Sequence, residues 1–253
     1  VVQVIRKETS GHAWIRIETA PVRYPVEHPR VLCRALCQSD KRVKTDEVVW
    51  VLDVQAVRAI GACMGEGIPL HERIVAVGGP GASNPCHFRA RVGTRLDRFL
   101  ESEDLGDTRR VLRGGLMRGS PAKPTAAVGY GDDAFFILPR PAAREFLGFV
   151  NPGFDRVSIL PCFISRLTGA ADRHLTASLR GERRPCIACG LCEDICPMGL
   201  LPQVLHRYLY RDAIDEAEKA GLSLCIGCGL CAYVCPSKIE LRHQFAEAQE
   251  RLR

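Results

Sequence analysis

The chain has 253 residues, of which 46% are hydrophobic and 25% charged, a composition typical of a folded soluble protein rather than a disordered one. No apolar run approaches the roughly 18 residues that span a bilayer, so a transmembrane protein is not expected. Aromatic residues make up only 6% and no base-stacking motif is found, so nucleic-acid binding is not expected either.

The net charge of +6 is unevenly distributed along the chain. Residues 182–253 carry 9 basic and 10 acidic side chains, so the positive excess lies before residue 182. This arginine-rich front could suit anionic lipid headgroups, an acidic partner or a phosphorylated cofactor. The simpler interpretation is a solvated surface, because the excess is modest for so long a segment.

The first part of the chain predicts short strands and turns. Residues 1–5 and 13–17 are β-prone, and the prolines at 21, 25 and 29 break the segment that follows. Residues 1–40 are therefore expected to form short strands and turns.

A strand, a helix and a second strand are predicted next, over residues 48–52, 54–64 and 73–77. Such a unit usually belongs to a parallel sheet covered by helices, so residues 1–86 are predicted to form a partial α/β, Rossmann-like domain. The glycines of residues 78–81 resemble a phosphate loop, but no helix opens directly after them. We interpret them as a plain turn.

A different pattern covers residues 87–140. A strand over 87–92, a helix over 95–101 capped by Thr94, and a strand over 134–138 that ends at a proline predict a small β-grasp (SLBB-like) module. Residues 141–181 are interpreted as a connector, in which phenylalanines at 146, 149 and 154 serve packing.

One cysteine run occurs twice near the C-terminus, and each copy has the spacing C-x2-C-x2-C-x3-C-P. This spacing wraps a cubane iron–sulfur cluster, whereas structural zinc sites use two separated ligand pairs. A disulfide framework is also not expected, because a chain of 253 residues can build its own core. Two [4Fe–4S] clusters are therefore predicted, and reduced cysteines and oxygen-sensitive clusters both favour the cytoplasm.

In two-cluster ferredoxins the fourth cysteine of each run ligates the other cluster. The same rule here assigns the first cluster to Cys186, Cys189, Cys192 and Cys235. It assigns the second cluster to Cys225, Cys228, Cys231 and Cys196.

The segments around the cysteines are predicted to form helices. Pro202 suits the first position of a helix, with an apolar side formed by residues 201, 204, 205, 208 and 209. Asp212 is predicted to cap a second helix that closes at Gly221, and residues 239–252 predict an amphipathic C-terminal helix. Residues 182–253 are therefore predicted to form an α-helical ferredoxin domain, and the whole chain an α+β multidomain protein.

Five further cysteines lie outside the repeat: Cys33, Cys37, Cys63, Cys86 and Cys162. A third metal site at Cys33 and Cys37 is conceivable, but free cysteine is commonly a small buried hydrophobe and no ligand pair lies nearby. The histidines form no metal-binding pattern, and neither a P-loop nor a Ser/His/Asp elbow is found. No catalytic and no nucleotide-binding residue is assigned.

Several segments resemble the A subunit of the sodium-translocating NADH:quinone reductase, over roughly residues 45–253. They are residues 48–61, 73–75, Gly79-Pro80, 109–119, 145–149 and Pro152-Gly153. The homologous C subunit of the Rnf ferredoxin:NAD oxidoreductase carries two similar cysteine motifs. Familiar A subunits have largely lost these ligands, whereas this chain keeps all eight cysteines.

The resemblance implies an electron-transfer subunit of a membrane-associated, ion-translocating NADH:quinone oxidoreductase, cytoplasmic and peripheral at the inner face of the membrane. Other subunits and a quinone are its implied partners. The chain has no initiator Met and lacks the family's N-terminal half, so FMN and NADH are expected in the missing region or in a partner. The alternatives are an Rnf-type C subunit, the iron–sulfur wire of a soluble dehydrogenase or heterodisulfide-type complex, and a scaffold whose clusters only hold the fold.

Overall fold

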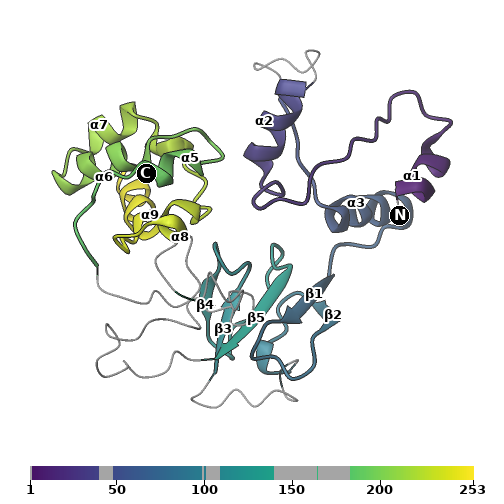
Figure 1. The fold of residues 1–253 in the computed structure, drawn as a ribbon. Coiled ribbons are helices and arrows are strands. Elements are labelled where there is room, and N and C mark those ends of the chain that lie inside the picture. Colours follow the sequence, from purple (N-terminus) through teal and green to yellow (C-terminus); the bar gives the residue numbers. More distant parts are fainter. Residues whose placement is uncertain (1, 40–47, 99, 101–108, 140–163, 165–182) are drawn as a thin grey trace. The chain divides into compact units, whose positions relative to one another are not determined.

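The structure, a computed structural model, describes residues 2–39, 48–98, 100, 109–139, 164 and 183–253 (Figure 1). Contacts divide the chain into two units, Val1–Val51 and Leu52–Arg253, and each is described by itself. The expected connector of residues 141–181 lies outside the described residues except for residue 164.

The first unit contains two helices, α1 (Val2–Thr9) and α2 (Pro29–Ser39). The strands predicted over residues 1–5 and 13–17 are therefore wrong. Strand propensity reflects packing on a sheet, and the described residues of this unit contain no strand for these segments to pair with. Pro29, which is predicted to interrupt regular structure, instead occupies the first position of α2, where its fixed φ favours the start of a helix.

Helix α3 (Val54–Glu66) has the predicted start and end. The side chain of Asp53 caps it by accepting a hydrogen bond from the Ala56 amide, and Gly67 ends it at a φ of 69°. The strand predicted over residues 48–52 is wrong, because these residues have no regular structure. Their apolar side chains are largely exposed, with Trp50 at 81%, so the apolar run is not evidence of a buried strand here.

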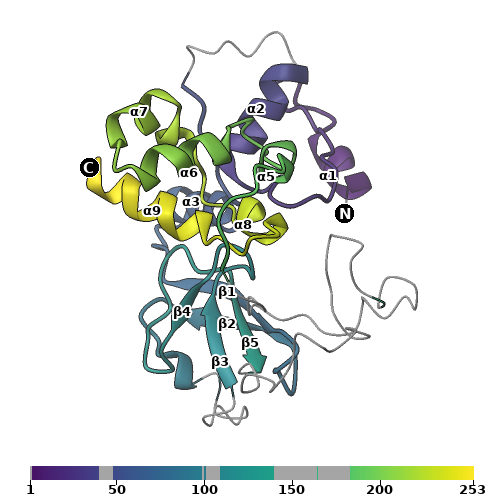
Figure 2. The ribbon, with the colours of Figure 1, turned by 60° about the vertical axis from the view of Figure 1, so that its left-hand side comes forward.

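A five-stranded mixed sheet follows, in the order β2-β1-β5-β3-β4. Its strands are β1 (Glu72–Gly78), β2 (Cys86–Arg91), β3 (Arg109–Arg113), β4 (Ser120–Ala122) and β5 (Ala134–Pro139). Figure 2 shows β3 and β5 side by side, in agreement with their antiparallel register of Val111 opposite Ile137. Their inward side chains form the core, in which Phe135 and Ile137 are at most 1% exposed.

Only β1 and β5 pair in parallel, and the other neighbouring strands are antiparallel. Among the described residues the sheet is therefore mixed rather than parallel, and strand β2 runs across the boundary expected between residues 86 and 87. The turn after β1 approaches β5 closely, since a Cβ on Gly79 would lie 2.5 Å from the Ile137 carbonyl oxygen. This close approach explains the glycine, and no helix follows it, as the turn interpretation predicted.

The helix predicted over residues 95–101 is only a 3-10 turn, η1 (Leu96–Arg98), in its described part. The amides of Leu96 and Asp97 donate to the carbonyls of Ala126 and Pro124. The Arg98 amide donates to the Arg95 carbonyl, three residues back, so the turn has the tighter 3-10 pattern of hydrogen bonds.

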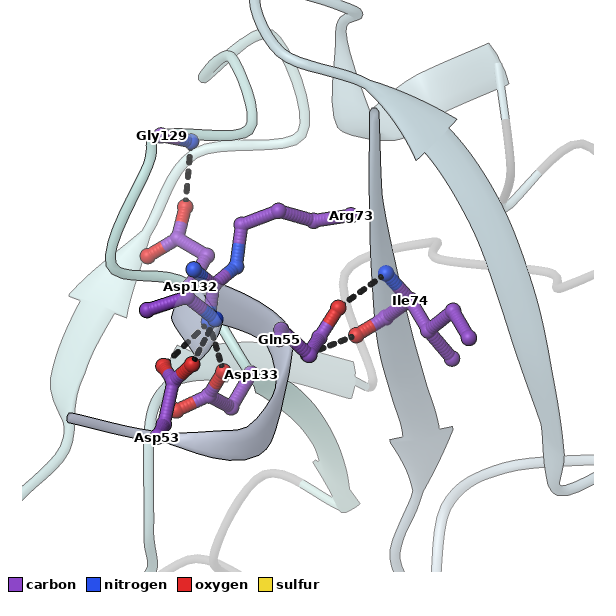
Figure 3. Close-up of polar contacts among 8 residues, drawn as sticks. Asp53, Gln55, Arg73, Ile74, Gly129, Asp132 and Asp133 are labelled. Carbon is purple, nitrogen blue, oxygen red and sulfur yellow. Dashed lines mark hydrogen bonds and ion pairs between the residues drawn. The ribbon is translucent and has the colours of Figure 1, made fainter. Parts of the chain in front are cut away.

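A polar network ties α3 to the sheet (Figure 3). Gln55 both donates to and accepts from the backbone of Ile74, at 3.0 and 2.7 Å. The guanidinium of Arg73, a residue only 4% exposed, bonds the carboxylates of Asp53, at 2.9 Å, and Asp133. A buried arginine requires such partners, so the network fixes the start of α3 against β1.

The C-terminal part is helical, as predicted. It contains α5 (Leu191–Asp194), α6 (Pro202–Tyr210), α7 (Ile214–Lys219), a 3-10 turn η3 (Leu222–Leu224), α8 (Leu230–Val234) and α9 (Leu241–Arg251). Pro202 starts α6 as predicted, and Leu205, Leu222 and Phe245 form a core that is at most 2% exposed. Within the part of the chain that the structure describes, no helix is long and apolar enough to cross a membrane.

Asp212 does not cap α7, which corrects the prediction. It adopts a φ of 56°, and its carboxylate accepts a hydrogen bond from Arg251 instead. Ala213 is the residue before α7, and its side chain cannot accept a hydrogen bond.

Candidate iron-sulfur centres

The first candidate centre is a cavity among α5, α6 and the start of α9. The four cysteines predicted for the first cluster, Cys186, Cys189, Cys192 and Cys235, all line it. Cys186 and Cys189 are exposed, and Cys192 and Cys235 are half-buried. Gln203, His206 and Ser237 are the polar side chains at this cavity, and the imidazole of His206 lies 2.7 Å from Gln244 Oε1.

The second candidate centre is a cavity among α6, α8 and α9. It is lined by the four cysteines predicted for the second cluster, Cys196, Cys225, Cys228 and Cys231. Cys228 is buried and the other three are half-buried. The structure therefore brings together each predicted set of four, three from one run and the fourth from the other.

The two cavities are related by an internal repeat of 39 residues, since Cys186 and Cys225 differ by that number. The same shift relates Cys196 to Cys235 and the first residue of α6 to that of α9. It also relates three pairs of residues with left-handed backbone: Ala188 (φ 51°) and Gly227 (62°), Gly190 (78°) and Gly229 (80°), Gly199 (65°) and Lys238 (56°).

Positive φ at a residue with a side chain is uncommon and costs free energy. Ala188 and Lys238 adopt it at positions where the other copy has glycine, so both copies keep the same left-handed backbone whichever residue occupies the position. Successive amides in such loops point into one concavity, which suits an anionic group.

Backbone amides point at the cysteine sulfurs. The Ala188 amide donates to Cys186 Sγ, and the Leu200 amide donates to Cys196 Sγ, both at 3.4 Å. Hydrogen bonds of this kind stabilise the charge on a thiolate and tune the potential of a cluster bound to it.

Burial makes three of the motif thiols harder to ionise. Burial, assisted by the Glu193 carboxylate, raises the pKa of Cys192 to about 11. Burial, assisted by the negative charge of the Cys225 and Cys228 thiolates, raises the pKa of Cys231 to about 12, and burial also raises the pKa of Cys228. Iron requires thiolates, and its positive charge supplies the compensation that these buried sulfurs lack.

Each cavity is lined by four motif cysteines, which is the number of thiolates that a cubane takes. Among the described residues, which include all eight motif cysteines, no three metal-ligating side chains are close enough to hold a single metal ion. None of the eight cysteines forms a disulfide. The cavities therefore fit the predicted clusters, and the cubane would supply one-electron redox chemistry there.

Three of the other cysteines can be placed. Cys33 and Cys86 are half-buried and Cys63 is exposed, each as a free thiol. The side chain of Cys37 and the whole of Cys162 lie outside the described residues, so the idea of a third metal site is not tested.

Comparison with known proteins supports this interpretation. Residues 185–239 match the family model of the 4Fe-4S dicluster domain. The chain is similar to the A subunit of the Na(+)-translocating NADH-quinone reductase of Alcanivorax borkumensis, with 31% identity over 71% of this chain and 40% of that protein. It is similar to the same protein of Shewanella denitrificans, with 32% identity over 68% and 39%, and of Teredinibacter turnerae, with 32% over 71% and 40%.

The resemblance inferred from the residues is therefore confirmed, and an iron–sulfur electron-transfer role is supported for this chain. The chain spans about two fifths of the length of the curated relatives it matches.

Sequence reasoning missed the side chains other than cysteine that line the cavities, chiefly Gln203, His206, Arg242 and Phe245. A signal was present, because the 39-residue shift extends beyond the cysteines and pairs Gln203 with Arg242 and His206 with Phe245.

Proposed function

We propose that this chain is an electron-transfer component, resembling the A subunit, of a membrane-associated, ion-translocating NADH:quinone oxidoreductase. Two [4Fe–4S] clusters pass single electrons through it, and the chain makes no covalent bonds by itself. The observation that supports this most strongly is the crossed set of four cysteines at each cavity. Cys186, Cys189, Cys192 and Cys235 would hold one cluster, and Cys225, Cys228, Cys231 and Cys196 the other.

The protein's contribution is to hold and tune the clusters. Its amides donate to the sulfurs of Cys186 and Cys196, and its apolar core keeps water from the second cavity through residues such as Phe245. The five-stranded sheet would brace the cluster domain against a neighbouring protein of the complex or border a quinone site. The working place of the chain would be the inner face of the cell membrane, in contact with the other subunits of the complex.

A second candidate is the C subunit of an Rnf-type ferredoxin:NAD oxidoreductase. The retention of all eight cysteines favours it, since familiar A subunits have largely lost them. The iron–sulfur wire of a soluble dehydrogenase or heterodisulfide-type complex is the third candidate. Genes for membrane subunits beside the gene for this chain would favour the first two candidates, and a gene for a soluble catalytic subunit in that place would favour the third.

The test is reduction of the anaerobically purified chain, which should contain about eight iron and eight sulfide in two four-iron clusters. Dithionite should reduce both clusters, while NADH alone should not, since the glycine turn after β1 leads into strand β2 rather than a helix N-terminus. NADH should reduce them once a flavin-bearing partner is supplied. Zinc in place of iron would contradict the proposal, and clusters that cannot be reduced reversibly would favour the scaffold.

A further inference from the structure

The internal repeat makes the two cavities equivalent except at a few positions. Gln203 is the second residue of α6 and lines the first cavity, and Arg242 is the second residue of α9 and lines the second. The 39-residue shift makes these two positions equivalent. One cavity therefore has a neutral amide where the other has a permanent positive charge.

Arg242 is held in place by the loop after β3. Its guanidinium donates to the carbonyl oxygens of Arg118, at 2.5 Å, and Gly119, at 3.4 Å. The same loop lies against the second cysteine run, because a Cβ on Gly229 would lie 2.7 Å from the Met117 carbonyl oxygen. At the equivalent Gly190 a Cβ would meet no atom within 4 Å. Two carbonyl oxygens therefore hold the guanidinium of this cavity-lining residue.

Gln203 offers a polar but uncharged group. Its Oε1 is buried, and no hydrogen-bond partner for it is found among the described residues. Thiolates and sulfides only accept hydrogen bonds, so the carboxamide can serve a cluster only by presenting its N–H2 group. A neutral donor of this kind stabilises added negative charge less than a guanidinium does.

Burial acts in the opposite direction. Cys228 of the second run is buried, whereas Cys186 and Cys189 of the first run are exposed. Reduction adds a negative charge to a cluster, and that charge is harder to accommodate in the less solvated cavity. Without a compensating charge, the second cluster would be markedly harder to reduce than the first.

We infer that Arg242 raises the reduction potential of the cluster in the second cavity, offsetting its burial, and that Gln203 leaves the first cluster without such a charge. The inference rests on the proposed function, since it needs both clusters. The clusters held by the motif cysteines would supply one-electron transfer, in which no bond is made or broken. Residues 203 and 242 then set the difference in reduction potential between the two clusters.

The test is an anaerobic redox titration of the full chain with dithionite, followed by electron paramagnetic resonance. Cys196→Ser identifies the step that belongs to the second cavity. Arg242→Gln should make that step about tenfold less favourable, about 59 mV for one electron, and leave the other step nearly unchanged. Gln203→Arg should make the first-cavity step more favourable by a similar factor.

Two controls sharpen the result. Arg242→Lys keeps the charge and should retain most of the wild-type potential, and Arg207→Gln removes a charge from an exposed position on α6 and should shift neither step appreciably. If Arg242→Gln retains both clusters but leaves the second step in place, the inference is wrong while the proposed function stands. If that variant fails to assemble the second cluster, Gln203→Arg decides whether the inference holds. A first reduction step that does not become more favourable in Gln203→Arg would overturn it. A wild-type chain without clusters would overturn both the inference and the proposed function.

Discussion

The five-stranded sheet and the C-terminal helical region achieve stability in different ways. The sheet has a continuous apolar core in which Val75, Phe135 and Ile137 are at most 1% exposed, and its one buried arginine has two carboxylate partners. The helical region has a smaller core, centred on Leu205 and Phe245, and its eight motif cysteines surround two cavities. We therefore expect the first region to fold on its own side chains and the second to depend on the clusters proposed for its cavities.

Removal of iron should have the largest effect, and it should separate the helical region from the sheet. Chelation of iron after oxidation of the clusters should unfold residues 183–253 while the sheet survives, because metal binding in such a region is coupled to its folding. Hydrogen exchange should show loss of protection in α6 and α9 and retained protection in β1 and β5. Reconstitution with iron and sulfide should restore it. Equal loss of protection in both regions would mean that the sheet is not independently stable.

The proposed crossed ligation predicts a second large effect within the helical region. Cys235→Ser should damage the cluster of the first run, and Cys196→Ser the cluster of the second, each lowering iron from about eight to about four per chain. Replacing all four cysteines of one run should disturb both clusters. Cys63→Ser, at an exposed thiol outside the runs, is the matched control and should retain all the iron. A fully normal cluster in the remaining run would show that the ligands are not crossed.

The sheet should respond to a core truncation that leaves the clusters intact. Ile137 is 0% exposed in the central strand β5, and Ile137→Ala should cost about 2–5 kcal/mol of unfolding free energy through lost contacts and the cavity left behind. Ile74→Ala, at a residue 40% exposed in the adjacent strand β1, is the control and should cost much less. Urea unfolding followed by circular dichroism, with iron analysis beside it, measures both. Loss of iron in Ile137→Ala would show that the two regions fold as one unit.

Much of this arrangement was predictable where local signals agree. Apolar periodicity coincides with a start or stop signal in helix α3, which has a cap and a terminal glycine, and in the apolar strands β1 and β5. The cysteine spacing is an equally local signal. The strands predicted within residues 1–17 and 48–52 are wrong, because a high strand propensity does not form a strand without a partner strand to pair with. The order of the sheet depends on long-range pairing, such as Ala76 with Ala134, which no local pattern specifies. The difference between Gln203 and Arg242 could have been found by extending the repeat beyond the cysteines.

The smallest expected effect concerns the pH dependence of the sheet region. The Ala56 amide and then the Arg73 guanidinium lower the pKa of Asp53, so its carboxylate stabilises the fold. The stability is fully present above the carboxylate's unfolded pKa of about 3.9 and is lost as the pH falls through the lower folded value. Because this side chain is 47% exposed, solvent screening should keep the contribution of its charge below about 1 kcal/mol.

Asp53→Asn keeps a capping oxygen but removes the charge, so stability at neutral pH should fall slightly and the acid dependence of α3 should weaken. Asp53→Ala loses the cap as well and should cost about 1 kcal/mol more. Hydrogen exchange of the α3 amides between pH 5 and pH 3, corrected for intrinsic rates, measures both variants. Protection in α9 should not respond to either substitution, because α9 and this network belong to regions stabilised in different ways. An Asp53→Asn chain with unchanged acid dependence would assign the stability of this network to its hydrogen bonds alone.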